Sequence, residues 1–155
     1  MTKRKLLEEE KNIPVHVVAV FAFIEKNGKI LLAKRSLNDP QAGGEWSIPG
    51  GKVEVDEGGA ILLKSLKKEI REEVGLEIED DIKLIWDEGF YRVSGHHVVG
   101  LTFLCRWKSG VAKALEGQEE VKWFDKKELK SFTGLPGYFR KRVSVLLKIL
   151  EKWTN

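Results

Sequence analysis

This sequence has 155 residues, of which 42% are hydrophobic and 33% are charged, and its formal net charge is +3. The composition is typical of one globular domain, residues 1–155, with a buried core, and it excludes a disordered chain. The longest apolar run, residues 17–24, is too short to cross a bilayer, and the N-terminus lacks the apolar stretch of a secretion signal. The one cysteine, Cys105, can form no internal disulfide and lies in an apolar segment, so we expect a buried thiol and a cytoplasmic protein without membrane association.

A β-hairpin is the first element that the sequence predicts. Its two strands, over residues 15–26 and 29–36, flank Asn27 and Gly28, which together form a strong signal for a two-residue turn. The first strand is apolar nearly throughout, as expected for a central strand that is covered on both faces.

The middle of the chain predicts a short strand, a helix and a second pair of strands. The short strand is expected over residues 46–51, after a polar loop. A helix follows from about 60 to 74 and ends at Gly75, because glycine readily adopts the left-handed conformation that closes a helix. The next two strands are expected over residues 82–93 and 96–107.

The last third predicts one more strand and two helices. The strand covers residues 119–124, and Asp125 is placed to cap a short helix after it. An amphipathic helix follows over about 138–152, and residues 1–12 are expected to be a flexible segment. Strands alternating with helices in this order indicate an α+β or α/β sandwich.

The basic C-terminal region of the sequence has two possible interpretations. From residue 126 to the end, the sequence has eight Lys and Arg residues and two Asp and Glu residues. Such a basic region suits phosphate-bearing partners, including nucleic acid, and it also fits a solvated helix face.

The helix over residues 60–74 carries its carboxylates in an unusual place. At about 100° per residue, its aliphatic side chains form one stripe, and Glu69, Glu72 and Glu73 border that stripe instead of lying opposite to it. The helix C-terminus adds partial negative charge at the same end. Either a divalent cation such as Mg²⁺ or a basic group from elsewhere in the fold would offset this charge.

The segments "GGKVEVDE" and "KEIREEVGL" resemble the Nudix box, G-x5-E-x7-R-E-U-x-E-E-x-G-U, in which U is aliphatic. Gly51 and Glu57 keep the spacing of the first half, and residues 69–76 match the second half in register. The sequence departs from the pattern in two ways. Lys68 replaces an arginine, and ten residues instead of seven separate Glu57 from Lys68.

The resemblance implies a fold, a reaction and a set of metal ligands. It implies an α/β/α sandwich with a mixed sheet between helices, and hydrolysis of a nucleoside diphosphate linked to another group, with Mg²⁺ that Mn²⁺ can replace. It assigns Glu72, Glu73 and the Gly50 carbonyl as metal ligands, and Glu69 either as holder of a metal-bound water or as general base. A further carboxylate is expected before the last strand, where Glu119 is favoured over its two neighbours, Glu116 and Glu120.

Other residues receive roles around the box. The resemblance gives Gly51, Glu57, Lys68 and Gly75 structural roles. Three candidates for substrate binding each have two interpretations. Arg35 contacts a phosphate or pairs with an acid of the box. Trp46 walls the pocket or fills the core, and Tyr91 contacts the substrate or is an ordinary strand aromatic.

Two other functions are compatible with the same fold. An isopentenyl diphosphate isomerase would need a cysteine and a glutamate in the pocket, and Cys105 in an apolar strand is poorly suited. A non-catalytic nucleotide-binding module would typically lose the box carboxylates, which this chain keeps. The hydrolase is therefore the prediction, with a nucleotide or another small diphosphate as substrate and with the choice between monomer and homodimer open.

Overall fold

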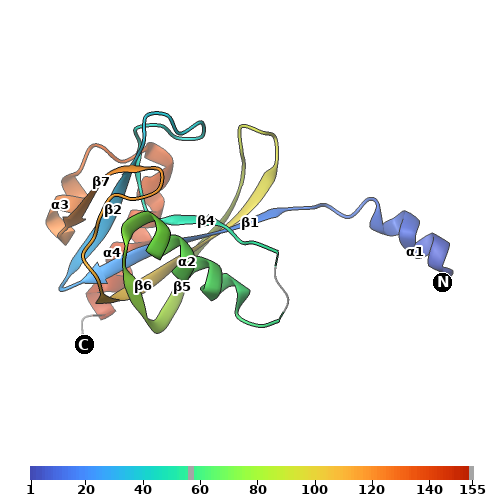
Figure 1. Cartoon of the computed structure of the whole chain (residues 1–155), viewed down its shortest axis with the longest axis horizontal. Helices are drawn as coiled ribbons and strands as arrows, with labels where there is room; N and C mark the ends of the chain where they lie inside the picture. Colours follow the sequence, from blue (N-terminus) through green and yellow to red (C-terminus); the bar gives the residue numbers. More distant parts are fainter. Residues whose placement is uncertain (56–57, 154–155) are drawn as a thin grey trace.

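The computed structural model describes residues 1–55 and 58–153, and its core is a seven-stranded mixed sheet (Figure 1). The strands follow the order β3-β2-β1-β6-β5, while β4 pairs with β1 and β7 pairs with β2. The elements are α1 (Lys3–Glu10), β1 (Val17–Lys26), β2 (Lys29–Arg35), β3 (Trp46–Ser47), β4 (Gly50–Lys52), α2 (Ile61–Val74), β5 (Glu77–Tyr91), β6 (His97–Ser109), β7 (Gln118–Phe124), α3 (Lys126–Ser131), the 3₁₀ turn η1 (Gly137–Phe139) and α4 (Arg140–Trp153).

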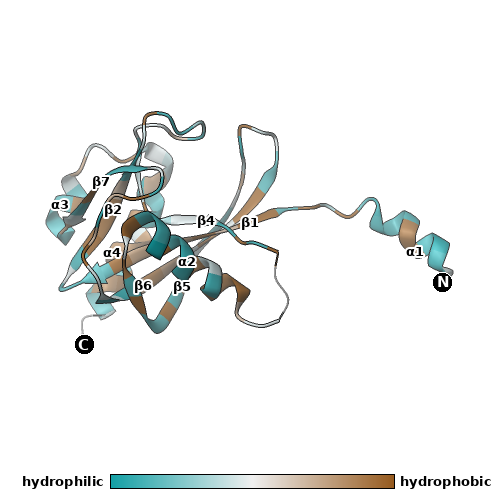
Figure 2. Cartoon of the chain, in the orientation of Figure 1, coloured by the Kyte–Doolittle hydropathy of each residue, from teal (hydrophilic) through white to brown (hydrophobic). Residues whose placement is uncertain are grey.

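Helices cover both faces of the sheet, and the alternation of side chains along β1 shows why. Val20, Ala22 and Ile24 of β1 pack in one core with buried residues of α2. Phe23 faces the other way and packs in a second core with residues of α3 and α4. Since successive strand residues point to opposite faces, an apolar strand of this kind needs a helix on each side. The predicted sandwich with a mixed sheet is confirmed, and Figure 2 shows apolar strands under helices whose outer faces are hydrophilic.

The central strands are fixed by one tight turn and one long-range pairing. Asn27 and Gly28 have φ values of 50° and 79°, as a hairpin turn of the predicted kind requires. The Glu25 carboxylate accepts a hydrogen bond from the Gly28 N–H at 2.7 Å. On its other side β1 runs parallel to β6 from Val17 to Glu25, which makes it the central strand that the sequence predicts.

Strand β5 begins earlier than the sequence predicts. It starts at Glu77 instead of residue 82 because Leu76 and Ile78 are buried immediately after α2 ends. The acidic residues 79–81 are exposed, and they interrupt the apolar pattern by which the strand could be recognised. The pairing with β6 shifts register in this stretch, so the strand bends as it passes α2.

The N-terminal segment, for which flexibility over residues 1–12 stays a prediction, contains one helix. Residues 3–10 form helix α1, whose N-terminal Thr2 side chain accepts a hydrogen bond from the Lys5 N–H. None of the residues of α1 is buried, and Figure 1 shows the helix standing away from the sheet at the end of an extended segment. In the described part of the chain, no helix has the length and apolar character needed to span a membrane.

Candidate active site

The C-terminal half of α2 brings two carboxylates to the edge of the sheet. Leu66, Ile70 and Val74 are buried, as the predicted apolar stripe requires, and Glu69 and Glu73 lie beside that stripe. The helix ends at Gly75, whose φ of 70° places it in the left-handed region and whose N–H donates to the carbonyls of residues 70 and 71.

The two glycines of β4 allow the backbone to approach these carboxylates. A Cβ atom on Gly51 would lie 2.5 Å from the Glu69 carboxyl carbon, and one on Gly50 would collide with the Val20 carbonyl. Glycine at position 50 thus permits the close approach of β4 to β1, and glycine at position 51 leaves room for the Glu69 carboxyl group against β4. This arrangement agrees with the structural role that the family resemblance implies for Gly51.

The carboxyl groups of Glu69 and Glu73 interact with each other through a side-chain hydrogen bond. Burial is the main cause that raises the pKa of Glu73 to about 8, and the neighbouring Glu69 carboxylate raises it further. Burial also raises the pKa of Glu69, while its hydrogen bond with Glu73 acts in the opposite direction. Both shifts have the direction expected for two neighbouring, partly buried carboxyl groups that do not both ionise readily.

Gln118 is a site residue that the sequence did not reveal. Its Nε2 atom donates to the Glu73 carboxyl group at 3.1 Å, and the Gly50 backbone forms another hydrogen bond with Glu73. A carboxylate was expected from the loop before β7, but the side chain that reaches Glu73 is an amide at the first position of β7. Glu116, Glu119 and Glu120 are exposed, and the metal role of Glu119 stays a prediction.

Glu72 lies on the more open side of α2. Its carboxylate is 3.9 Å from the Lys68 Nζ atom, and Lys68 also pairs with Glu54 at 2.7 Å. Lys68 thus joins the helix to the segment that follows β4. Glu57, the remaining carboxylate of the box, falls outside the described residues.

The donor set suits a divalent cation. Glu69 and Glu73 supply hard carboxylate oxygens, and a cation would favour the ionised form of both carboxyl groups, which burial disfavours. As they stand, no three His, Cys, Asp or Glu side chains converge to hold a metal ion within residues 1–55 and 58–153. The metal roles of Glu72 and of the Gly50 carbonyl stay predictions.

A cavity of about 340 Å³ opens directly over the two carboxylates. We call it the acidic cavity, although cationic side chains also line it. Glu69, Glu73 and the two glycines form one part of its wall, and Arg35, Lys52 and Arg92 form another. Carboxylates facing cations are suited to a metal bound together with phosphate groups.

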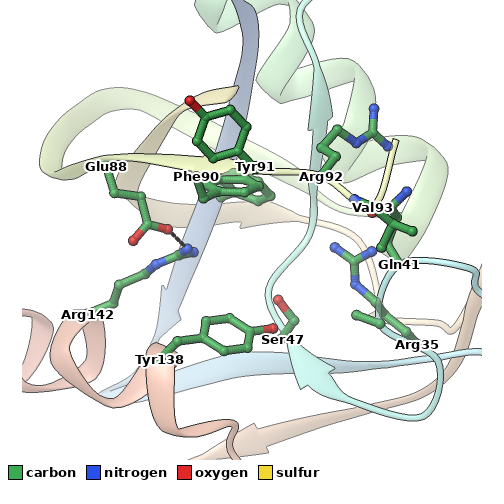
Figure 3. A pocket seen from close by; sticks show the side chains of 12 residues that line it. Arg35, Gln41, Ser47, Glu88, Phe90, Tyr91, Arg92, Val93, Tyr138 and Arg142 are labelled. Atoms are coloured by element: carbon green, nitrogen blue, oxygen red, sulfur yellow. Dashed lines mark hydrogen bonds and ion pairs between the residues drawn. The ribbon is translucent and has the colours of Figure 1, made fainter. Parts of the chain in front are cut away.

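A second cavity of about 360 Å³ adjoins the first, and we call it the aromatic cavity (Figure 3). Its walls include Phe90, Tyr91 and Tyr138, together with the charged side chains of Glu88 and Arg142. The two cavities share five lining residues, namely Phe21, Arg35, Gln41, Phe90 and Arg92. A single ligand can therefore occupy both.

The substrate-binding candidates fall in different places. Arg35 lines both cavities, and within residues 1–55 and 58–153 its ion pair is with Asp39, in the loop after β2, at 3.2 Å and not with an acid of the box. Its charge still reaches the box, because it lowers the pKa of Glu73. Tyr91 lines the aromatic cavity. Trp46 belongs to the second core, where its ring lies 5.9 Å from that of Phe124.

The single cysteine is inaccessible from either cavity. Cys105 is fully buried in the core under α2, and burial raises the pKa of its thiol to about 12. A neutral, enclosed thiol is a poor nucleophile, which is unfavourable to an isomerase that needs a cysteine in its pocket.

Comparison with known proteins gives concordant matches. The NUDIX domain family model matches residues 14–143. The CTP pyrophosphohydrolase of Escherichia coli (strain K12) is 48% identical over 61 residues, which cover 39% of this chain and 42% of that protein. The ADP-ribose pyrophosphatase of Methanocaldococcus jannaschii is 37% identical over 112 residues, which cover 70% of this chain and 61% of that protein. The chain thus spans less than two thirds of the length of these two relatives.

Among solved structures, the MutT NUDIX hydrolase from Burkholderia pseudomallei is 28% identical to this chain, with a TM-score of 0.70. The superposition covers 85% of this chain and 98% of that one. The sheet and its flanking helices are therefore common to both proteins.

Proposed function

This chain belongs to the Nudix hydrolase family, and on that premise we propose that it hydrolyses the diphosphate linkage of a nucleoside diphosphate-X substrate with the help of Mg²⁺, which Mn²⁺ can replace. The observation that carries the proposal is the Glu69–Glu73 pair at the floor of the acidic cavity, next to a cavity with aromatic walls. One cavity suits a diphosphate and the other a nucleoside.

The cation would be held by Glu69 and Glu73, with Glu72 and the Gly50 carbonyl as further ligands. When bound, it would neutralise charge on the diphosphate and lower the pKa of the attacking water. Gln118 keeps the Glu73 carboxyl group in place through its hydrogen bond. Glu69 either positions the attacking water or takes its proton, and the short distance from Gly51 holds its carboxylate against β4.

The remaining charges suit the substrate phosphates. Arg35, Lys52 and Arg92 line the acidic cavity and can donate hydrogen bonds to phosphate oxygens. Water would attack one phosphorus in line with the departing phosphate or nucleotide, and these cations would stabilise the charge that develops on the oxygens.

The activities for which the two relatives are named support a nucleotide substrate. One is a CTP pyrophosphohydrolase and the other an ADP-ribose pyrophosphatase, so both act on a diphosphate linkage that is attached to a nucleoside. The aromatic cavity can receive the nucleoside part of such substrates.

The proposal is tested by measuring the nucleotides and phosphates released from a panel of nucleoside triphosphates, ADP-ribose and dinucleoside polyphosphates. Each reaction is run with Mg²⁺ and with EDTA. Glu73→Gln keeps the shape of the side chain, and we expect it to lower kcat/KM at least about 100-fold. Glu79→Gln on β5 is the matched control, because Glu79 is exposed and lies outside both cavities.

Hydrolysis by the wild type that is lost in EDTA and in Glu73→Gln, and kept in Glu79→Gln, would support the proposal. Hydrolysis that persists in Glu73→Gln would contradict it. Failure of the wild type to cleave any member of the panel, with nucleotide binding intact, would favour a binding module instead.

A further inference from the structure

A buried ion pair forms one wall of the aromatic cavity. Arg142 of α4 is 5% exposed, and its guanidinium donates a hydrogen bond to the carboxylate of Glu88 on β5. Both side chains line the cavity, and Figure 3 shows them on one side of it with Arg35 and Gln41 on the other. The pair therefore lies at the end of the cavity that is away from Arg35, one of the two arginines shared with the acidic cavity.

The pair retains unused hydrogen-bonding capacity. The Nε atom of Arg142 is buried and has no hydrogen-bond partner in the described part of the chain. The second Glu88 oxygen accepts from the Trp86 indole N–H at 3.2 Å, and each carboxylate oxygen can accept one more bond. Burial lowers the pKa of Arg142 to about 10, so the guanidinium is still charged at neutral pH.

Stability alone does not account for this arrangement. A buried ion pair can often be replaced by apolar residues without loss of stability, and a buried donor without a partner is unfavourable. An acceptor and a donor that stand side by side in a cavity wall are instead suited to a ligand that offers the complementary pair.

The rest of the cavity suits a planar ring. The side chains of Phe21, Phe90, Tyr91 and Tyr138 line it, and aromatic rings stack favourably on nucleobases. Because Phe21, Phe90 and Arg35 also line the acidic cavity, a base held near Arg142 leaves its phosphates directed toward Glu69 and Glu73.

We propose that Glu88 and Arg142 select nucleobases in which an exocyclic amine adjoins a ring nitrogen, as in cytosine, adenine and guanine. The amine donates to the Glu88 carboxylate, and the unprotonated ring nitrogen beside it, which is N3 of cytosine, N1 of adenine or N3 of guanine, accepts from the Arg142 guanidinium. This inference rests on the proposed function, because it assumes that a nucleotide is the substrate.

Bases with oxo groups in place of the amine fit less well. In uracil the N3–H donor lies between two carbonyl oxygens, so a carboxylate that accepts from it also meets a carbonyl lone pair. In hypoxanthine the exocyclic amine of guanine is absent. A site built from buried polar groups discriminates strongly against a ligand that leaves them unpaired.

Two pairs of ligands, in which only one member carries the exocyclic amine, measure how much the amine contributes to binding. The α,β-methylene analogues of CTP and UTP, and those of GTP and ITP, are compared by isothermal titration calorimetry in Mg²⁺, and hydrolysis of the four natural triphosphates is measured in parallel. We expect wild type to bind the member with the amine about tenfold more tightly in each pair. Glu88→Gln should reduce this preference below about threefold, and Glu79→Gln on the same strand should leave it unchanged.

Arg142→Lys provides a second variant in case Glu88→Gln does not fold. It keeps the charge beside Glu88 but removes the planar fork, and we expect it to weaken binding of the amine-bearing analogues about tenfold. Thermal unfolding of each variant is recorded to identify loss of the fold.

The outcomes separate the two proposals. A preference for the amine that disappears in Glu88→Gln supports the base-selecting pair, even if no triphosphate is hydrolysed and the proposed function fails. Hydrolysis of all four triphosphates with equal binding in each pair supports the function and overturns the pair. A preference that Glu88→Gln leaves intact also overturns it.

Discussion

At the scale of single residues, Gly51 couples the strand to the carboxylate pair. Replacing it by alanine would place a methyl group 2.5 Å from the carboxyl carbon of Glu69, which lies at the end of a flexible side chain. The side chain can move away, so the fold should tolerate the change while the site should not.

We therefore expect Gly51→Ala to lower Mg²⁺-dependent kcat/KM roughly 10–100-fold and to change Tm by less than about 2 °C. Gly59→Ala is the matched control, because a Cβ atom there would meet nothing within 4 Å. Equal activity of the two variants would show that the position of Glu69 does not limit the reaction.

The Cys105 thiol gives a second prediction, for pH dependence. Its pKa in the folded protein is raised to about 12 by burial, so the folded state keeps a proton that the unfolded state loses above about pH 8.5. The thiol's contribution to stability is therefore fully present below that pH, and it decreases as pH rises toward 12.

At pH 9 we expect a disulfide reagent to label native Cys105 at least about 100-fold more slowly than the urea-unfolded chain, since the thiolate is the reactive form. Absorbance of the released aromatic thiol measures both rates. Comparable rates would mean that β6 is not enclosed as the structure describes.

At the scale of elements, α3 shows how a local signal can fix a helix. Asp125 accepts a hydrogen bond from the Glu128 N–H at 2.8 Å, and the Glu128 side chain accepts from the Asp125 N–H, which completes a capping box. We expect Asp125→Ala to destabilise the protein by about 1 kcal/mol and to lower Tm by about 3 °C.

Hydrolytic activity should be unchanged in this variant, because Asp125 follows the end of β7 opposite to Gln118. Asp125→Asn keeps an oxygen that can cap the helix and should retain nearly the stability of wild type in a thermal melt. A loss of stability as large as that of the alanine variant would assign the effect to charge instead of capping.

Elements with local signals could be predicted from the sequence, and the remainder depends on contacts between distant residues. The Asn27–Gly28 turn, the α2 stripe and the Asp125 cap each involve neighbours in the chain, and all three are confirmed. The parallel pairing of Val17 with Val98 joins residues too far apart for any local pattern to specify. Gln118 could not be identified from the sequence for the same reason, because its hydrogen bond with Glu73 forms only where β7 lies beside α2.

At the scale of the whole molecule, α1 contributes no buried residue to the domain. We expect deletion of residues 2–12 to leave Tm within about 2 °C of wild type and kcat/KM within about twofold, as thermal melts and the nucleotide assay would measure. This deletion keeps His16, whose ring contacts that of His97 at the start of β6. A lower Tm or a later elution from a sizing column would show that α1 packs against another chain.

The two ends of α2 differ in how firmly they are held. Its last turn is fixed by Gly75, by the buried Val74 and by the contacts of Glu73, whereas its first turn follows Ala60 in a left-handed conformation with no side-chain cap. The three extra residues of the box precede that first turn and leave the last one untouched. Chains of this kind are therefore best aligned backward from the closing glycine, because a count that runs forward from Gly51 would assign the roles of Glu69, Glu72 and Glu73 to the wrong residues.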